Sequence, residues 1–141
     1  MDTIVVDVIA ISGPPGPSGP PGMTVTINGS WDWQSGAQTG AISNNKVGLD
    51  NDTPAQANWI HISAVANGGK NYGAMIRRMQ AGSQVYIWDP ADNQRWGTWR
   101  VAAAPENNGT WFRIPVAPLD WQGGEPQQNN ADVEVALVFA G

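Results

Sequence analysis

The sequence predicts a mainly β protein, an antiparallel β-sandwich with one short helix, preceded by a collagen-like Gly-X-Y tract and an extended N-terminal arm. Short β-prone runs recur between turn signals from residue 24 onward. Glycine returns at every third position over residues 13–22, and the first 12 residues are rich in Ile and Val. We therefore expect an anchoring arm over 1–12, a collagen-like tract over 13–23 and a β-sandwich domain over 24–141.

The strand runs of the domain are recognised by Val, Ile, Thr and aromatic residues, many of them in alternation with polar ones. They cover residues 25–27, 46–49, 59–63, 84–88, 97–103, 110–116 and 133–139. Glycine, asparagine, aspartate and proline mark turns at 28–29, 67–69, 89–90, 107–109 and 123–124. Strands at this regular spacing favour a sandwich.

One helix interrupts the strands. Tyr72, Met75, Ile76 and Met79 recur at the spacing of one helix face. Gly82 follows at a position suited to a helix C-cap. We expect a single short helix here.

The arm is apolar on both faces of an extended chain. Its anchoring residues are Ile4, Val6, Val8, Ile9 and Ile11. A strand of this kind must pair with something, because alone in water it is an aggregation hazard. It is either a strand of the same domain or a docking arm that inserts into a partner or pairs between subunits. We favour the docking arm, since the tract holds it away from the domain. It lacks the basic leading region of a signal sequence, and we assign it to the mature protein.

The tract places glycine in a strict register at Gly13, Gly16, Gly19 and Gly22. Only hydrogen fits at the crowded axis of a collagen triple helix, so this period predicts three chains. Five of the 11 prolines of the chain fall here and preset the extended conformation. The alternative is a stiff polyproline linker in a monomer. At about 30 Å the tract is too short to hold three chains by itself, so we expect it to act as a stiff spacer.

The charge balance excludes several classes of partner. The formal net charge is −5, from 12 acidic and 7 basic residues. Nucleic-acid binding needs clustered Lys and Arg, and anionic membranes attract basic patches. We expect neither partner. The chain has no cysteine, so disulfides and Cys-ligated metals are excluded.

The sequence carries little that suggests catalysis. His61 is the one histidine and sits in mid-strand between two isoleucines, where a face residue or a satisfied buried residue is the usual role. Asp50 and Asp52 resemble the start of a calcium loop, but the glycine and closing glutamate at calcium-loop spacing are missing. No nucleophile elbow, zinc-protease motif or phosphate loop occurs. We expect no enzyme, no cofactor and no metal.

Tryptophan is the compositional anomaly, at eight of 141 residues. Those within strand runs are expected in the core: Trp59, Trp88, Trp99 and Trp111. Three others lie beside glycine turns or in loop-like sequence next to Asp and Gln: Trp31, Trp33 and Trp121. These are ligand or interface aromatics, since exposed Trp beside polar groups stacks on sugars and large aromatics also fill protein interfaces.

Four segments resemble a globular module of bacteriophage virion proteins, namely 43–49, 82–89, 99–101 and 105–116. Short collagen-like tracts commonly precede this kind of module. The resemblance implies a trimeric fibre or surface decoration of a virion and transfers no catalytic role. We expect a non-catalytic homotrimer of head-fibre or decoration type, because a 141-residue chain with one domain and no long shaft is short for a host-reaching tail fibre. Its arm would bind a capsid or tail protein. The alternative is a tail-fibre or receptor-binding tip that contacts a host-surface glycan.

Overall fold

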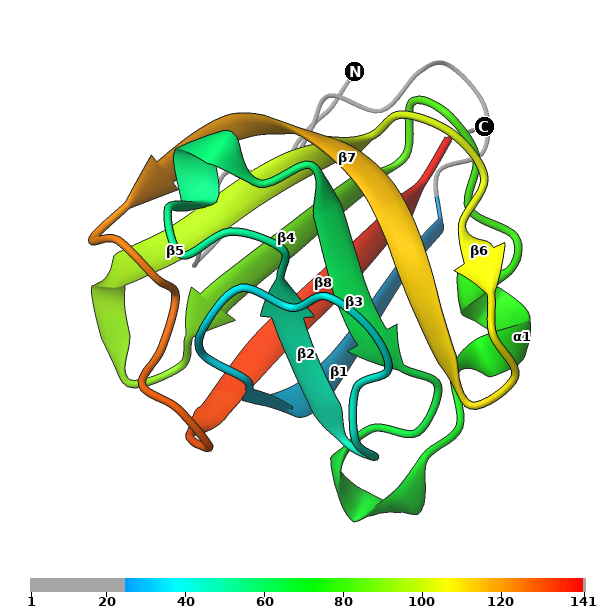
Figure 1. Ribbon diagram of the computed structural model, residues 1–141, viewed down its shortest axis with the longest axis horizontal. Helices are drawn as coiled ribbons and strands as arrows, with labels where there is room; N and C mark the ends of the chain where they lie inside the picture. Colours follow the sequence, from blue (N-terminus) through cyan, green and yellow to red (C-terminus); the bar gives the residue numbers. More distant parts are fainter. Residues whose placement is uncertain (1–24, 141) are drawn as a thin grey trace, which may run out of the picture.

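The computed structural model describes residues 25–140 (Figure 1). Inward and outward side chains alternate along its strands. The arm residues Ile4 to Ile11 and the glycine register Gly13 to Gly22 lie outside the described residues. The strands are β1 (Val25–Trp33), β2 (Lys46–Leu49), β3 (Trp59–Ser63), β4 (Gln84–Asp89), β5 (Asp92–Val101), β6 (Glu106–Asn107), β7 (Trp111–Gln122) and β8 (Asp132–Phe139). The helical elements are η2 (Pro54–Gln56), η3 (Asn67–Gly69) and α1 (Gly73–Ile76).

The strands close into a barrel rather than the two packed sheets of a sandwich. Their order is β3-β2-β1-β8-β4-β5-β7, and a further pairing of β3 with β7 closes the ring. The short β6 pairs with β7 outside this ring. The mainly β fold with a short helix is confirmed, but the sandwich is not. Closure gives most strands two neighbours and so protects edges that a sandwich leaves open.

Most pairings are antiparallel, as expected, and one is not. β1 and β2 run parallel, with Asp32 opposite Lys46 and Trp33 opposite Val47. The connection over residues 34–45 therefore crosses back along the outside of the barrel. A Cβ on Gly48 of β2 would lie 2.7 Å from the carbonyl oxygen of Gln34, so this connection packs directly against β2.

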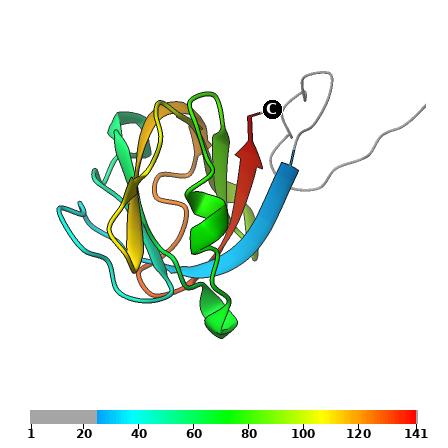
Figure 2. The ribbon, with the colours of Figure 1, turned by 90° about the vertical axis from the view of Figure 1, so that its right-hand side faces the viewer.

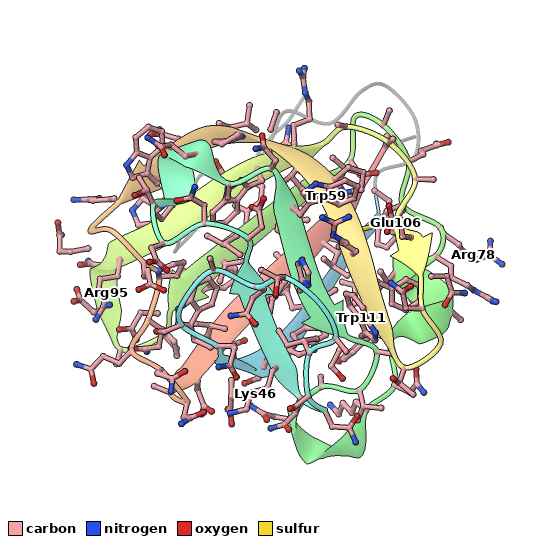
Figure 3. All side chains as sticks on the ribbon, in the orientation of Figure 1. Lys46, Trp59, Arg78, Arg95, Glu106 and Trp111 are labelled. Carbon is pink, nitrogen blue, oxygen red and sulfur yellow. The ribbon has the colours of Figure 1, made fainter. Side chains whose placement is uncertain are left out.

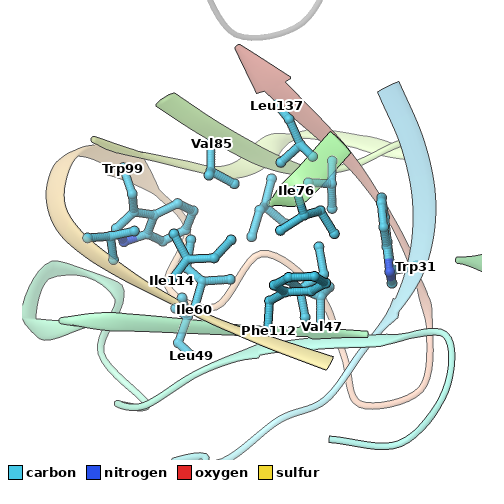
Figure 4. Close-up of a cluster of buried hydrophobic side chains, with 14 of the residues drawn as sticks. Trp31, Val47, Leu49, Ile60, Ile76, Val85, Trp99, Phe112, Ile114 and Leu137 are labelled. Carbon is cyan, nitrogen blue, oxygen red and sulfur yellow. The ribbon is translucent and has the colours of Figure 1, made fainter. Parts of the chain in front are cut away.

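The barrel interior holds the main core (Figure 4). On each strand every second residue points inward, as the sequence pattern predicts. The largest fully buried side chains include Trp31, Trp33, Trp99 and Phe112, with Ile60, Ile62, Ile87, Ile114 and Leu137 around them. The tryptophans fill the width that a seven-strand ring encloses.

Two of these tryptophans lie over a glycine of their own strand. A Cβ on Gly29 would stand 2.6 Å from the Trp31 ring, and one on Gly97 would stand 2.4 Å from the Trp99 ring. Both strands thus carry Gly two residues before Trp, so that the indole can fold back over the backbone. This explains why the turn predicted at 28–29 is wrong: Gly29 lies inside β1 and makes room for Trp31.

The predicted helix is shorter than expected. α1 is a single turn, followed by a hydrogen-bonded turn through Arg78. Ile76 and Met79 are buried and Tyr72 packs on the core, so the predicted apolar face is confirmed. Gly82 has a φ of 96° but does not cap the helix; its N–H donates to the carbonyl of Val101.

Four other turn predictions are confirmed. Gly68, Gly69, Gly109, Gly123 and Gly124 all have positive φ in the predicted turns. Asn107 accepts from the Gly109 N–H at 2.9 Å and shapes the β6–β7 hairpin. Asp89 accepts from the Ala91 N–H at 2.8 Å in the β4–β5 turn. Among the helices of residues 25–140, none has the length and apolar character needed to cross a membrane.

Candidate binding surface on strands β3 and β7

The closing pair of the barrel carries a group of polar and aromatic contacts on its outer side. β3 and β7 are antiparallel, with His61 opposite Arg113 and Ser63 opposite Trp111. Ile60, Ile62, Phe112 and Ile114 point inward and are fully buried. The residues that alternate with them point outward and, with Glu106 of β6, form what we call the β3–β7 surface: Trp59, His61, Glu106, Trp111 and Arg113. Figure 3 labels Trp59, Glu106 and Trp111 of this surface.

Arg113 is the centre of this surface. Its guanidinium carbon lies 3.8 Å from the centroid of the Trp59 ring, which is a cation–π contact. Its Nη1 is 3.8 Å from Oε1 of Glu106, opposite it on β6. The Arg113 and Glu106 side chains are 33% and 52% exposed, so the ion pair adds little stability. The stacking on Trp59 is the contact that fixes the guanidinium plane.

His61 lies under the connection between β1 and β2. Its ring stacks on Trp111 at 5.3 Å and 18° between planes. Its Nδ1 is 2.8 Å from the carbonyl oxygen of Gly40, and because a carbonyl only accepts, Nδ1 carries the proton. Burial, and then the nearby Arg113 cation, lower the pKa of His61 below its usual 6.5, against the opposing pull of the Gly40 carbonyl. The imidazole is therefore neutral at pH 7.

Two nitrogens of the β3–β7 surface are buried and have no hydrogen-bond partner among the described residues. They are Nε2 of His61 and Nε of Arg113, on directly paired residues. In the neutral ring Nε2 only accepts, whereas the arginine Nε only donates. Because both atoms are buried, neither is accessible to a ligand at the surface.

The structure separates the three aromatic residues predicted as ligand or interface groups. Trp31 and Trp33 are 0% and 1% exposed inside the barrel, so the prediction is wrong for both. Their indole N–H groups donate to the carbonyl of Ser63 and to Glu125 Oε1, each at 3.0 Å. The reason is the longer β1, which places both side chains on its inward face. Trp121 is 44% exposed at the end of β7 and remains a candidate.

The prediction that four tryptophans pack in the core is confirmed for one of them and wrong for the other three. Trp99 is fully buried, as expected, and donates to the carbonyl of Pro54 at 3.4 Å. Trp59, Trp88 and Trp111 are only partly buried, so the prediction is wrong for them. The signal was present in the strand alternation: Trp59 and Trp111 each stand two residues from a polar residue, His61 or Arg113, and so share its outward face.

The acidic residues considered for calcium have a structural role. Asp50 Oδ1 accepts from the N–H groups of Asn58 and Trp59 at 2.8 and 3.1 Å, which ties the loop to the start of β3. Within residues 25–140, no group of three or more His, Asp or Glu side chains is placed to hold a metal ion.

No family model, no curated protein and no solved structure matches this chain.

Proposed function

We propose that this protein is a non-catalytic, homotrimeric structural protein of a phage virion surface, of head-fibre or decoration type. The N-terminal arm binds a capsid or tail protein, the tract acts as a stiff spacer, and the barrel is displayed outward. The observation that carries the proposal is the direct junction of tract and barrel: β1 begins at Val25, three residues after Gly22 of the glycine register. A spacer joined so closely to a folded domain sets the position of that domain.

The chemistry of the β3–β7 surface agrees with a structural role. Its histidine is neutral, buried and held by Gly40, whereas a general acid or base must reach a substrate proton. Its arginine is stacked and paired rather than free to contact a substrate.

Electron microscopy of phage particles assembled in cells that express this chain with a C-terminal tag tests the proposal. We expect label on the particle surface, and label lost when residues 1–12 are deleted. Particles that lack the protein, or a purified chain that turns over a polysaccharide panel, would contradict it.

A second candidate function is that of a tail-fibre or receptor-binding tip for a host-surface glycan. The observation that favours it is the β3–β7 surface, where the partly exposed rings of Trp59 and Trp111 share an outward face with the Glu106 carboxylate, whose side chain is 52% exposed. Sugar hydroxyls and the apolar faces of sugar rings are suited to such a combination.

Glycan-array binding of the full chain tests this second function with two matched variants. Loss of binding in Trp111→Ala but not in Trp121→Ala would assign the ligand to the β3–β7 surface. Loss in Trp121→Ala alone would assign it to the end of β7. A full chain that binds no glycan would remove this candidate.

A further inference from the structure

A segment without helix or strand covers part of the outer side of β3. It is the connection between β1 and β2, residues 34–45, which runs in front of β2 and β3 in Figure 1. Figure 2 shows it beyond these strands, at the left-hand edge of the turned molecule. His61 points outward from β3 and is nevertheless 0% exposed, because this connection passes over it. A polar side chain is thus buried outside the hydrophobic core.

The connection is fixed at two points and held weakly between them. The N–H groups of Gln38 and Asn45 each donate to a backbone carbonyl of the barrel at 2.9 Å. We call the six residues between them, 39–44, the strap. Among the residues that the structure describes, the strap has one hydrogen bond to a residue distant in sequence, from Nδ1 of His61 to the Gly40 carbonyl at 2.8 Å. The polar contact of the strap with the barrel therefore depends on His61.

Protonation of His61 is unfavourable while the strap is closed. The proton would go to Nε2, which is buried and has no acceptor among residues 25–140. It would also place a cation opposite Arg113 on β7. The strap itself has no titratable side chain. Two carboxylates favour the imidazolium, Asp50 just after β2 and Glu106 of β6, but the first accepts backbone N–H groups and the second pairs with Arg113. Burial is the largest effect, and it lowers the pKa of His61.

An open strap would remove both obstacles to protonation. Water can accept the Nε2 proton and screen the Arg113 cation, so the pKa of an imidazole in contact with water returns toward about 6.5. Protons then bind more tightly to the open form and shift the population toward it. Ile42 is the one buried side chain of the strap and favours the closed form at neutral pH. Opening exposes this side chain and breaks one long-range hydrogen bond, so it requires less free energy than unfolding of the barrel.

We propose that the strap is an acid-sensitive cover: below about pH 6.5, proton binding to His61 releases residues 39–44 from β3 and uncovers the His61 ring, which stacks on Trp111. Because one proton is bound, the ratio of open to closed molecules rises by at most about tenfold for each unit by which the pH falls. Opening enlarges the accessible part of the β3–β7 surface. This inference needs neither the trimer nor a glycan ligand, so it is tested separately from both proposed functions.

A spin label on the strap of the full chain tests the inference. The sequence has no cysteine, so Ala41→Cys allows a single nitroxide to be attached at an exposed strap position. We expect its electron paramagnetic resonance spectrum to show faster motion as the pH falls from about 7 to about 5. The midpoint should equal that of the NMR titration of His61, the one histidine of the chain.

Two matched variants serve as controls. In His61→Gln the side chain can still donate to the Gly40 carbonyl but does not titrate, so we expect the strap label to keep one spectrum. Ala91→Cys places the label at an exposed position in the β4–β5 turn instead, where only unfolding of the barrel should change its motion. Near-UV circular dichroism confirms that each variant is folded.

A strap label whose spectrum stays constant down to about pH 5 would overturn the inference. An equal response in folded His61→Gln would also overturn it, because the strap would then open without this proton. So would labels at Ala41→Cys and Ala91→Cys that gain motion together, since that result reports unfolding of the whole barrel. If His61→Gln does not fold, the two midpoints measured in the chain with His61 decide, and separate midpoints would contradict the inference.

Discussion

The tryptophans inside the barrel and those outside it differ in what they contact. Trp31, Trp33 and Trp99 fill the core and each donates its indole N–H to a fixed acceptor. Trp59 and Trp111 stack on Arg113 and His61 on the outer surface. The high tryptophan content therefore has two physical reasons, one inside the barrel and one on its surface. The inner group sets the width and stability of the barrel, whereas the outer group builds surfaces on it.

The largest expected effect is the loss of an inner tryptophan. Trp99→Ala removes a fully buried ring and leaves a cavity, so we expect unfolding free energy to fall by about 3–5 kcal/mol. Trp121→Ala, at 44% exposure, should change it by less than about 0.5 kcal/mol. Urea unfolding of both variants measures the difference. Equal losses would mean that the division between inner and outer tryptophans is wrong.

The glycine beneath Trp99 gives the next largest effect. Gly97→Ala puts a Cβ within 2.4 Å of the indole, and the ring must shift in a packed core. We expect a loss of about 1–3 kcal/mol, the usual cost of overpacking. Gly40→Ala is the control, since a Cβ there meets nothing within 4 Å. Equal melting temperatures of the two variants would show that the packing of the Trp99 indole does not depend on the glycine.

The stacking of Arg113 on Trp59 contributes less to the free energy of unfolding than the buried tryptophans do. Arg113→Ala removes the contact with Trp59 and the weak pair with Glu106, and we expect a loss of about 0.5–1 kcal/mol. Arg113→Lys keeps the charge but not the planar group, so most of the loss should remain. If Lys restores full stability in urea unfolding, charge rather than stacking holds this surface.

The smallest expected effect is the pH response of His61. Its pKa is lowered in the folded protein, so below pH 6.5 the unfolded chain binds more protons and stability falls as the pH falls. Above that value the contribution is complete and constant. Burial raises the pKa of Glu134, so that group acts in the opposite sense and in the acidic range of a carboxyl group. Melting temperatures of the wild type and of His61→Gln between pH 5 and 8 should differ in slope only below about pH 6.5. Parallel curves would contradict the buried, neutral imidazole.

Local features of this fold could be predicted from the sequence, and long-range ones could not. The observed bounds of β2 and β3 match the runs that the sequence predicts over 46–49 and 59–63, because alternation and turn residues are local signals. Barrel closure depends on the pairing of Trp59–Ser63 with the start of β7, about 50 residues later, and alternation is the same in a sandwich and a barrel. Sequence alone could not rank the two.

The candidate surface shows the same limit. A single histidine stands out in the sequence, but its neighbour Arg113 comes from another strand and no local signal joins the two residues. The prediction that Trp31 and Trp33 are exposed is wrong because Asn28-Gly29 is a turn signal in most contexts. Here Gly29 lies within a strand and leaves room for the ring of Trp31, two residues later. Side-chain packing within one strand overrode the local preference for a turn.

We propose that this chain works as a trimer. Sedimentation equilibrium of the full chain measures this most directly, because it gives mass independently of shape. We expect three times the chain mass of 15.0 kDa. A species of a single chain mass that persists as the protein concentration rises would contradict it.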